Sequence, residues 1–325
     1  MALSRRTLIL GASAPLLLAN PPVFLSDAAA DTATYVYDPL GRLIRVHLSD
    51  GTVIVYDYDA AGNRIRQVRG NGNPFSQTLQ ITGTGPVNLR TIADQAGYTG
   101  ITDATITFQL GSTVTISGAP GAPNGGIALD TGLWPSSQFA ISLTLQVSGK
   151  IYGGGGAGGS GAGGDAIYCR NNITVVVNAG GQVKAGGGGG GGGGGWQLDT
   201  QGAEGEWTTS YLEGGGGGGG FPNGPGGTSA GPGGSGASGT SSGGGAGGAA
   251  GTQLQHTAGA GGAGGGAAAT GAAGATGSGS PGCGSTRCWT GPFSGAPGGA
   301  PGYAIRKNGK TVTVTNNGTI TGTQA

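Results

Sequence analysis

Short stretches of alternating apolar and polar residues recur along the chain, and each of them leads into glycine. The stretches SLTLQVSGKIYGG (142–154), ITVVVNAGGQVKAGG (173–187) and TVTVTNNGTITGT (311–323) share one plan. An alternating strand reaches a turn at glycine, a shorter strand follows, and glycine returns. A period of two places successive side chains on opposite faces of a strand. Repetition of the whole unit predicts stacked rungs of the β-helix type.

The region before these units is also rich in strand-forming residues. Residues 71–151 alternate with a period of two and predict a β-rich spacer, and residues 303–325 predict a closing pair of strands. Within the spacer, ATITFQLGSTVTISG (104–118) predicts a β-hairpin, because two alternating stretches flank a glycine. The stretch VNLRTIADQAGY (87–98) is the one place where we expect a helix.

Near the N-terminus, one unit occurs twice, as YVYDPLGRLI (35–44) and YDYDAAGNRI (56–65). Each copy joins a tyrosine-rich strand to an Asp-x-x-Gly turn, in which the aspartate bonds the turn backbone and glycine supplies a positive φ. The unit resembles the tyrosine-aspartate (YD, or Rhs) repeat family. The residues that match the pattern are Tyr37, Asp38, Gly41, Arg42, Tyr58, Asp59, Gly62 and Arg64. The resemblance implies an extracellular β module over 31–70, which joins strands of another YD, Rhs or fibre-type protein.

Composition limits how the rest of the chain can fold. Glycine supplies 81 of 325 residues, only 9% are charged and 6% are aromatic, so a core of side chains cannot extend throughout. The net charge of +1, without a basic stripe, argues against binding to nucleic acid. Residues 152–302 consist mostly of glycine and other small residues, without the strict three-residue period of collagen.

Two interpretations of this glycine-rich region compete. A flexible tether is one, and an ordered bundle of left-handed threefold helices of the polyproline II type is the other. Ordering costs about 1–2 kcal/mol per residue, which hydrogen bonds between neighbouring helices roughly offset. Aromatic residues and alternating strands lie at the ends of the glycine runs, and a tether needs neither. We therefore predict an all-β fold with a polyglycine II helical bundle, in which short β-hairpin modules bracket the packed glycine helices.

A second resemblance supports the bundle. The segments VSGKIYGGGGAGGSG (147–161) and GAPGGAPGYAI (295–305) open and close two longer glycine blocks. In this arrangement, residues 86–325 resemble the glycine-rich domain of phage and prophage tail-fibre adhesins. The resemblance implies that polyglycine II helices pack into a sandwich, and that variable loops between them contact a host receptor. Together with the N-terminal features, it favours a surface protein that carries a phage-like tip.

The loops between the glycine runs carry the candidate binding residues. Aromatic side chains on rigid loops give contact area at a low cost in entropy. We expect them to bind a cell-surface glycan or an outer-membrane protein, although some, Trp196 and Phe221 above all, are equally expected to cover the ends of the runs. The alternative is a structural or spacer component of an Rhs-type system. The candidate residues are Trp196, Trp207, Tyr211, Trp289 and Phe293.

No pattern in the sequence predicts catalysis or a cofactor. His47 and His256 have no nucleophile in a recognisable setting, and we expect both to face solvent. The stretch SGAGGDAIY (160–168) approximates a calcium-binding nonapeptide, but only one copy is present, and calcium needs oxygens from stacked copies. Asp165 is therefore expected to be a turn residue, and the protein is expected to be non-enzymatic.

The remaining features concern export and cysteine chemistry. Arg5 and Arg6 precede an apolar stretch and the small residues 28–30, so residues 1–30 predict an export signal, twin-arginine-like, with the general secretory route left open. The expected location is periplasmic, cell-surface or extracellular. No later apolar run is long enough to span a membrane. Cys283 and Cys288 predict a local disulfide, and Cys169 is expected to be buried.

Overall fold

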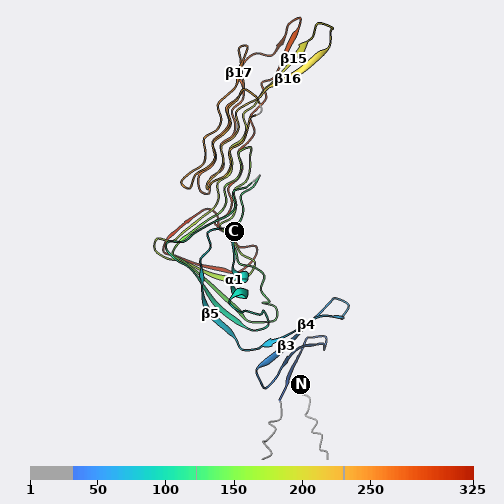
Figure 1. Cartoon of the computed structure of the whole chain (residues 1–325), viewed down its shortest axis with the longest axis vertical. Helices are drawn as coiled ribbons and strands as arrows, with labels where there is room; N and C mark the ends of the chain where they lie inside the picture. Colours follow the sequence, from blue (N-terminus) through green and yellow to red (C-terminus); the bar gives the residue numbers. More distant parts are fainter. Residues whose placement is uncertain (1–31, 122, 230) are drawn as a thin grey trace, which may run out of the picture.

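The protein is an elongated body with β modules at both ends and in its middle (Figure 1). The structure, a computed structural model, describes residues 32–121, 123–229 and 231–325. A small antiparallel sheet lies near the N-terminus (Figure 1). Next to it lies a parallel β-helix, which also contains the C-terminus. Long glycine-rich runs then lie side by side and lead to a second small sheet at the far end.

The middle body consists of three parallel sheets that share their rungs, as the repeated units predict. The first sheet has the order β22-β13-β10-β7-β5, the second β23-β14-β11-β8 and the third β21-β12-β9-β6. The strands of the first sheet are β5 (Phe75–Ile81), β7 (Ala104–Leu110), β10 (Ile141–Val147), β13 (Ile173–Val177) and β22 (Val312–Asn316). The second contains β8 (Thr115–Ser117), β11 (Lys150–Tyr152), β14 (Gln182–Lys184) and β23 (Thr319–Thr321). The third contains β6 (Val87–Asn88), β9 (Leu129–Asp130), β12 (Ile167–Tyr168) and β21 (Ile305–Arg306).

Alternation places one face of each strand inside the β-helix. Strand β10 runs in register with β7 on one side and β13 on the other, so that Phe108, Leu145 and Val175 stack in one column. All three side chains are fully buried. Such columns of apolar side chains form the main core of the molecule.

Two local predictions are changed by this architecture. The stretch 104–118 does not form a hairpin, because β7 and β8 lie in different sheets and each pairs in parallel with the next rung. The turn after Leu110 redirects the chain to the next side of the β-helix instead of reversing it. The helix α1 (Leu89–Gln95) is shorter than expected, and the Asn88 side chain caps it by accepting a hydrogen bond from the amide of Thr91.

The glycine-rich segments leave the β-helix at one corner, between the second and third sheets. Successive rungs insert residues 118–128, 153–166 and 185–304 at this position. The segments 71–151 and 303–325 therefore belong to one β-helix, although the longest insertion separates them in the sequence. Strands β12, β13 and β14 are also part of it, although they lie inside the segment 152–302.

Asp165 fixes the return of the longest insertion. Its buried carboxylate accepts hydrogen bonds from the amide of Tyr303, at 2.8 Å, and from the Nη2 atom of Arg306, at 2.9 Å. These residues flank the start of β21, which pairs with β12 directly after Asp165. The carboxylate thus joins two adjacent rungs at the corner where the chain comes back.

The glycine runs bond to one another through their main chains with a period of three residues. Amides of the run 186–194 donate in turn to carbonyls of the segments 161–164, 215–221 and 269–275, over N···O distances of 2.6–3.0 Å. Carbonyls of residues 186–195 accept bonds from three further segments, 156–159, 259–265 and 293–302. This central run is therefore surrounded by six neighbours. We call the packed segments of 153–164 and 186–302 the glycine bundle.

The close packing of the glycine bundle explains its composition. A Cβ atom added at eight of the nine positions of 186–194 would lie 1.8–2.2 Å from a main-chain oxygen of a neighbouring run. Real Cβ atoms do not approach so closely, so only glycine fits these positions. The exception is Gly192, whose added Cβ would meet nothing nearer than 3.9 Å. The interpretation of this region as a featureless tether does not fit the structure.

The N-terminal module is an antiparallel sheet of β1 (Thr34–Tyr37), β2 (Leu43–His47), β3 (Thr52–Tyr58) and β4 (Arg64–Asn71). Its two repeated turns use the expected chemistry. Asp38 accepts bonds from the amides of Leu40 and Arg42, and Asp59 accepts bonds from the amide and side chain of Asn63. Hydrogen bonds from the Arg42 amide and side chain lower the pKa of Asp38, and those from Asn63 lower the pKa of Asp59.

The module docks on the base of the β-helix. Val53 and Val55 of β3 form a small apolar cluster with Ile101 and Phe139 of the β-helix. The guanidinium group of Arg45 lies over the Phe139 ring at 4.2 Å, and Gln138 donates to Asp57 over 3.0 Å. The two bodies therefore share a packed contact.

Alanine substitutions at a crowded and at an uncrowded glycine should differ in their effect on stability. Gly190→Ala places a methyl group 2.0 Å from the carbonyl oxygen of Gly262, and we expect a loss of about 1–3 kcal/mol in the free energy of unfolding. Gly192→Ala meets open space, so its stability should be unchanged or raised by up to about 1 kcal/mol through the unfolded chain. Denaturant unfolding followed by circular dichroism measures both, and equal stabilities would contradict the packing described here.

Candidate functional site

The end of the protein farthest from the N-terminus carries a small antiparallel sheet with the order β16-β15-β20-β19 (Figure 1). Its strands are β15 (Trp196–Gln201), β16 (Trp207–Leu212), β19 (Gly282–Cys283) and β20 (Arg287–Thr290). A two-stranded hairpin of β17 (Thr252–Gln253) and β18 (His256–Thr257) lies beside it. We call these six strands the tip. Glycine runs lead into it and away from it, so the bundle determines where the tip strands start.

The inner face of the tip has its own aromatic core. Trp196 and Trp289 are both buried, and their ring centroids lie 6.3 Å apart, edge to face. The ring of His256 stacks on Trp289 at 4.0 Å and meets Trp196 at 4.7 Å. Trp196 and Trp289 therefore hold the tip together, and Trp196 covers the end of a glycine run, which is one of the two roles expected of it.

His256 differs from the expectation that it faces solvent. Its Nδ1 atom lies 3.0 Å from the carbonyl oxygen of Leu254, and its Nε2 atom lies 3.1 Å from that of Ser280. The expectation failed because the sequence does not show that the insert 252–257 folds back on the two tryptophans. His256 is a structural residue of the tip core, and the other histidine, His47, is half-buried in β2.

Three of the five candidate aromatic residues are exposed. The exposed fractions of Trp207, Tyr211 and Phe293 are 51%, 62% and 46%. Trp207 and Tyr211 both lie on β16, four residues apart, and their cross-strand partners on β15 are Gln201 and Gln197. A period of two therefore places both rings on the outer face of the sheet.

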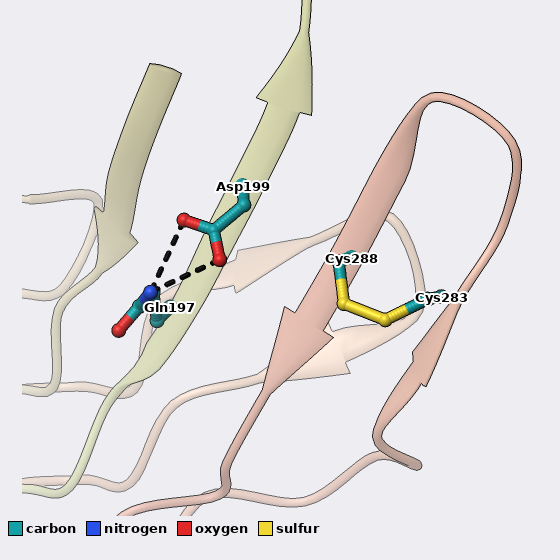
Figure 2. The surroundings of a disulfide bond; sticks show 4 residues. All are labelled: Gln197, Asp199, Cys283 and Cys288. Carbon is teal, nitrogen blue, oxygen red and sulfur yellow. Dashed lines mark hydrogen bonds between the residues drawn. A yellow bond between two sulfur atoms is a disulfide. The ribbon is translucent and has the colours of Figure 1, made fainter. Parts of the chain in front are cut away.

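Polar side chains lie between the two exposed rings. Asp199 lies opposite Thr209, whose hydroxyl donates to its carboxylate over 2.7 Å. The side-chain amide of Gln197 donates to both oxygens of the same carboxylate, at 3.0 and 3.1 Å (Figure 2). The outer face thus presents an acidic, hydrogen-bonding centre between two aromatic rings.

A disulfide stands beside this centre. It joins Cys283 to Cys288, the two cysteines that the sequence pairs, and these residues lie opposite each other on β19 and β20 (Figure 2). Both cysteines line a depression of about 520 Å³ together with Trp207, Asp199 and Thr209. The bond closes the short loop that carries Arg287, and it constrains one wall of the outer face.

A second cavity lies where the tip meets the glycine bundle. It has a volume of about 510 Å³. Tyr211 and Phe293 line it together with glycines of the runs 186–195 and 214–220. We call it the glycine groove and define its floor as Gly192, Gly193, Gly214 and Gly217. Sequence reasoning did not identify it, since a run of identical residues gives no sign of which position lacks a neighbour.

Two further kinds of feature, a metal-binding cluster and a membrane-spanning helix, were sought in the described part of the chain. Residues 32–121, 123–229 and 231–325 contain no group of three or more histidine, cysteine, aspartate or glutamate side chains that could hold a metal ion. Over the same residues, no helix is long and apolar enough to cross a membrane. Asp165 is the one acidic residue of the calcium-like stretch, and its carboxylate accepts hydrogen bonds from Arg306 and from the amide of Tyr303. Arg5 and Arg6 of the predicted export signal lie outside the described residues.

Comparison with known families identifies both parts of the chain. The family model of the phage tail fibre adhesin Gp38 matches residues 76–325, and the chain belongs to that family. The RHS repeat model matches residues 37–74, which cover most of the N-terminal module. Comparisons with curated proteins and with solved structures found no match. The protein is thus an adhesin-family chain behind an N-terminal repeat module, and together the two matches suggest an exported or surface protein.

The cysteines provide a test of the core and the tip together. Cys169 is free and fully buried in the β-helix, and burial raises the pKa of its thiol to about 12. At pH 8 the thiol is therefore protonated and unreactive. We expect iodoacetamide to modify no cysteine in the native protein, one after denaturation, and all three after denaturation with reduction. Rapid modification in the native state, measured by mass spectrometry, would contradict the buried position.

Proposed function

We propose that the protein is an exported surface adhesin that binds its receptor through the outer face of the tip. The observation that carries this proposal is the pair of exposed rings, Trp207 and Tyr211, on a sheet whose inner face is anchored by buried tryptophans. Exposed apolar surface that is gathered in one place, with polar groups around it, is typical of interaction sites. Membership of the adhesin family supports the same conclusion.

The proposed receptor is a cell-surface glycan or an outer-membrane protein. Aromatic rings offer a large contact area while losing little rotamer freedom, and residues of this type dominate binding energies. The carboxylate of Asp199 between the rings would accept hydrogen bonds from hydroxyl or amine groups. This combination suits a ligand with both apolar faces and polar donors.

The glycine bundle acts in this proposal as a stiff support. We propose that its runs are polyglycine II helices, because each run returns to the same neighbour every third residue, the repeat of that helix. A central run with six hydrogen-bonded neighbours has little freedom to bend. A rigid support lowers the entropy lost when the tip binds.

The N-terminal module is the proposed point of attachment. Its edge strand β1 carries the exposed rings of Tyr35 and Tyr37. Unpaired edges of sheets readily accept further strands, so a YD, Rhs or fibre-type protein is the proposed partner for 31–70. Residues 1–30 are the proposed export signal, with the twin-arginine pair Arg5 and Arg6, and the proposed location is periplasmic, cell-surface or extracellular.

The alternative function is that of a non-enzymatic spacer in an Rhs-type secreted or cell-surface system. The RHS repeat match over 37–74 favours it. In that case the bundle holds the N-terminal module away from another component, and the chemistry of the tip surface has no role. The two functions therefore differ in whether exposed tip residues matter.

A binding experiment with tip variants tests the proposal. The variants Trp207→Ala and Tyr211→Ala remove exposed rings, and their double mutant should lose at least about tenfold in affinity for receptor-bearing cells, since each anchor ring contributes about 1–2 kcal/mol or more. Binding of the fluorescently labelled protein to cells, measured by flow cytometry, gives the affinity.

The control is Leu133→Ala, which removes an exposed apolar side chain from the β-helix, away from both the tip and the N-terminal module. It should bind cells as the unmodified protein does, and all variants should melt at the same temperature. If the double mutant bound cells with undiminished affinity, the adhesin proposal would be wrong and the spacer function would be preferred.

A further inference from the structure

The glycine groove is the place where the bundle lacks one run. The segment 153–164 enters the bundle beside the run 186–195 and turns back at Gly159 and Ser160, both of which have a positive φ. Up to this turn, Gly156 and Gly159 donate to the carbonyls of Gly187 and Gly190. Beyond it, no described segment continues along the same line, and the groove opens there.

Main-chain groups along the floor of the groove lack partners. Within the described residues, the amides of Gly192, Gly214 and Gly217 and the carbonyl of Gly193 make no hydrogen bond. The amides of Gly191, Gly193, Gly215 and Gly216 beside them all do. Gly214 and Gly217 are three residues apart, which is the repeat of the bundle. The unpaired groups therefore lie where a further run would bond.

Gly192 gives a second, independent indication. Every other glycine from 186 to 194 is required, because a Cβ atom would meet the main chain of a neighbour within 2.2 Å. At Gly192 the nearest atom would be 3.9 Å away, and its φ is not in the left-handed region. Among the described residues, nothing requires glycine here. A run lying in the groove would require it, for the same reason as at the other eight positions.

We propose that the glycine groove binds an extended, glycine-rich segment of a partner polypeptide, which adds one run to the bundle. Its carbonyls would accept from the amides of Gly214 and Gly217, and one of its amides would donate to the carbonyl of Gly193, as Gly156 and Gly159 do to Gly187 and Gly190. Its residues that face the floor must be glycine, since neighbouring runs of the bundle leave no room for side chains.

The ends of the groove fit this occupant. Inside the bundle, a buried aromatic ring covers the end of a glycine run: Phe221 ends the run 214–220 and packs against Tyr152 at 5.3 Å. Tyr211 and Phe293 border the groove but remain largely exposed. An added run would pack against both rings. A sugar chain would offer hydroxyl groups without the three-residue repeat, so the pattern of unpaired groups favours a peptide.

The experiment uses the whole chain and fluorescein-labelled pentaglycine, with binding followed by fluorescence anisotropy. The unmodified protein should bind the peptide saturably. Gly192→Ala should weaken binding by about tenfold or more, because the methyl group occupies the space of the added run while leaving the fold intact. The matched control Gly266→Ala also adds a methyl group in open space, but away from the groove, and should bind normally.

Three results would overturn the proposal: no saturable binding of pentaglycine, equal binding of labelled pentavaline, or unchanged binding by Gly192→Ala. Labelled maltoheptaose that bound the unmodified protein but not Gly192→Ala would assign the groove to glycans instead. The proposal shares Tyr211 with the adhesin site, but the two can be tested separately. Trp207 lies outside the groove, so Trp207→Ala should still bind pentaglycine even if it no longer binds cells.

Discussion

Main-chain hydrogen bonds between closely packed glycine runs are the interaction on which the rest of this structure depends. Eight of the nine amides of 186–194 donate to a carbonyl of a neighbouring run, and at eight of the nine positions there is no room for a Cβ atom. Glycine normally lowers the stability of an ordered segment because of the entropy it loses. Here it is the one residue that allows the runs to approach closely enough to bond. The glycine bundle can therefore pack into an ordered body only because its runs lack side chains.

The β-helix aligns the glycine runs that pack in this way. Its three sheets set the rungs in register, and each insertion leaves and returns at the same corner. Neighbouring runs are consequently anchored side by side at the rungs, which reduces the entropy cost of aligning them. Asp165 and Arg306 secure the return of the longest insertion to its rung. At the other end, Trp196 and Trp289 close the bundle and support the strands of the tip.

Much of the β architecture could be predicted from the sequence, because its signals are local. Alternation indicated the rungs, and the Asp-x-x-Gly units indicated the two turns at Asp38 and Asp59. The hairpin expected over 104–118 failed because alternation does not distinguish a reversal from a turn between two sides of a β-helix. At the tip, the residue type alone did not show which aromatic side chains are buried. Trp196 and Trp207 have the same side chain, and only the fold places one inside and the other outside.

Amide hydrogen exchange across residues 186–194 tests the central claim most directly. If the runs bond to one another as described, exchange in this segment should be slower than in an unstructured chain by at least about a hundredfold. Gly192 should exchange faster than Gly190 and Gly191, because its amide alone among these three has no partner among the described residues. Exchange at random-coil rates throughout the segment would contradict the account, since a disordered run could support neither the groove nor the tip.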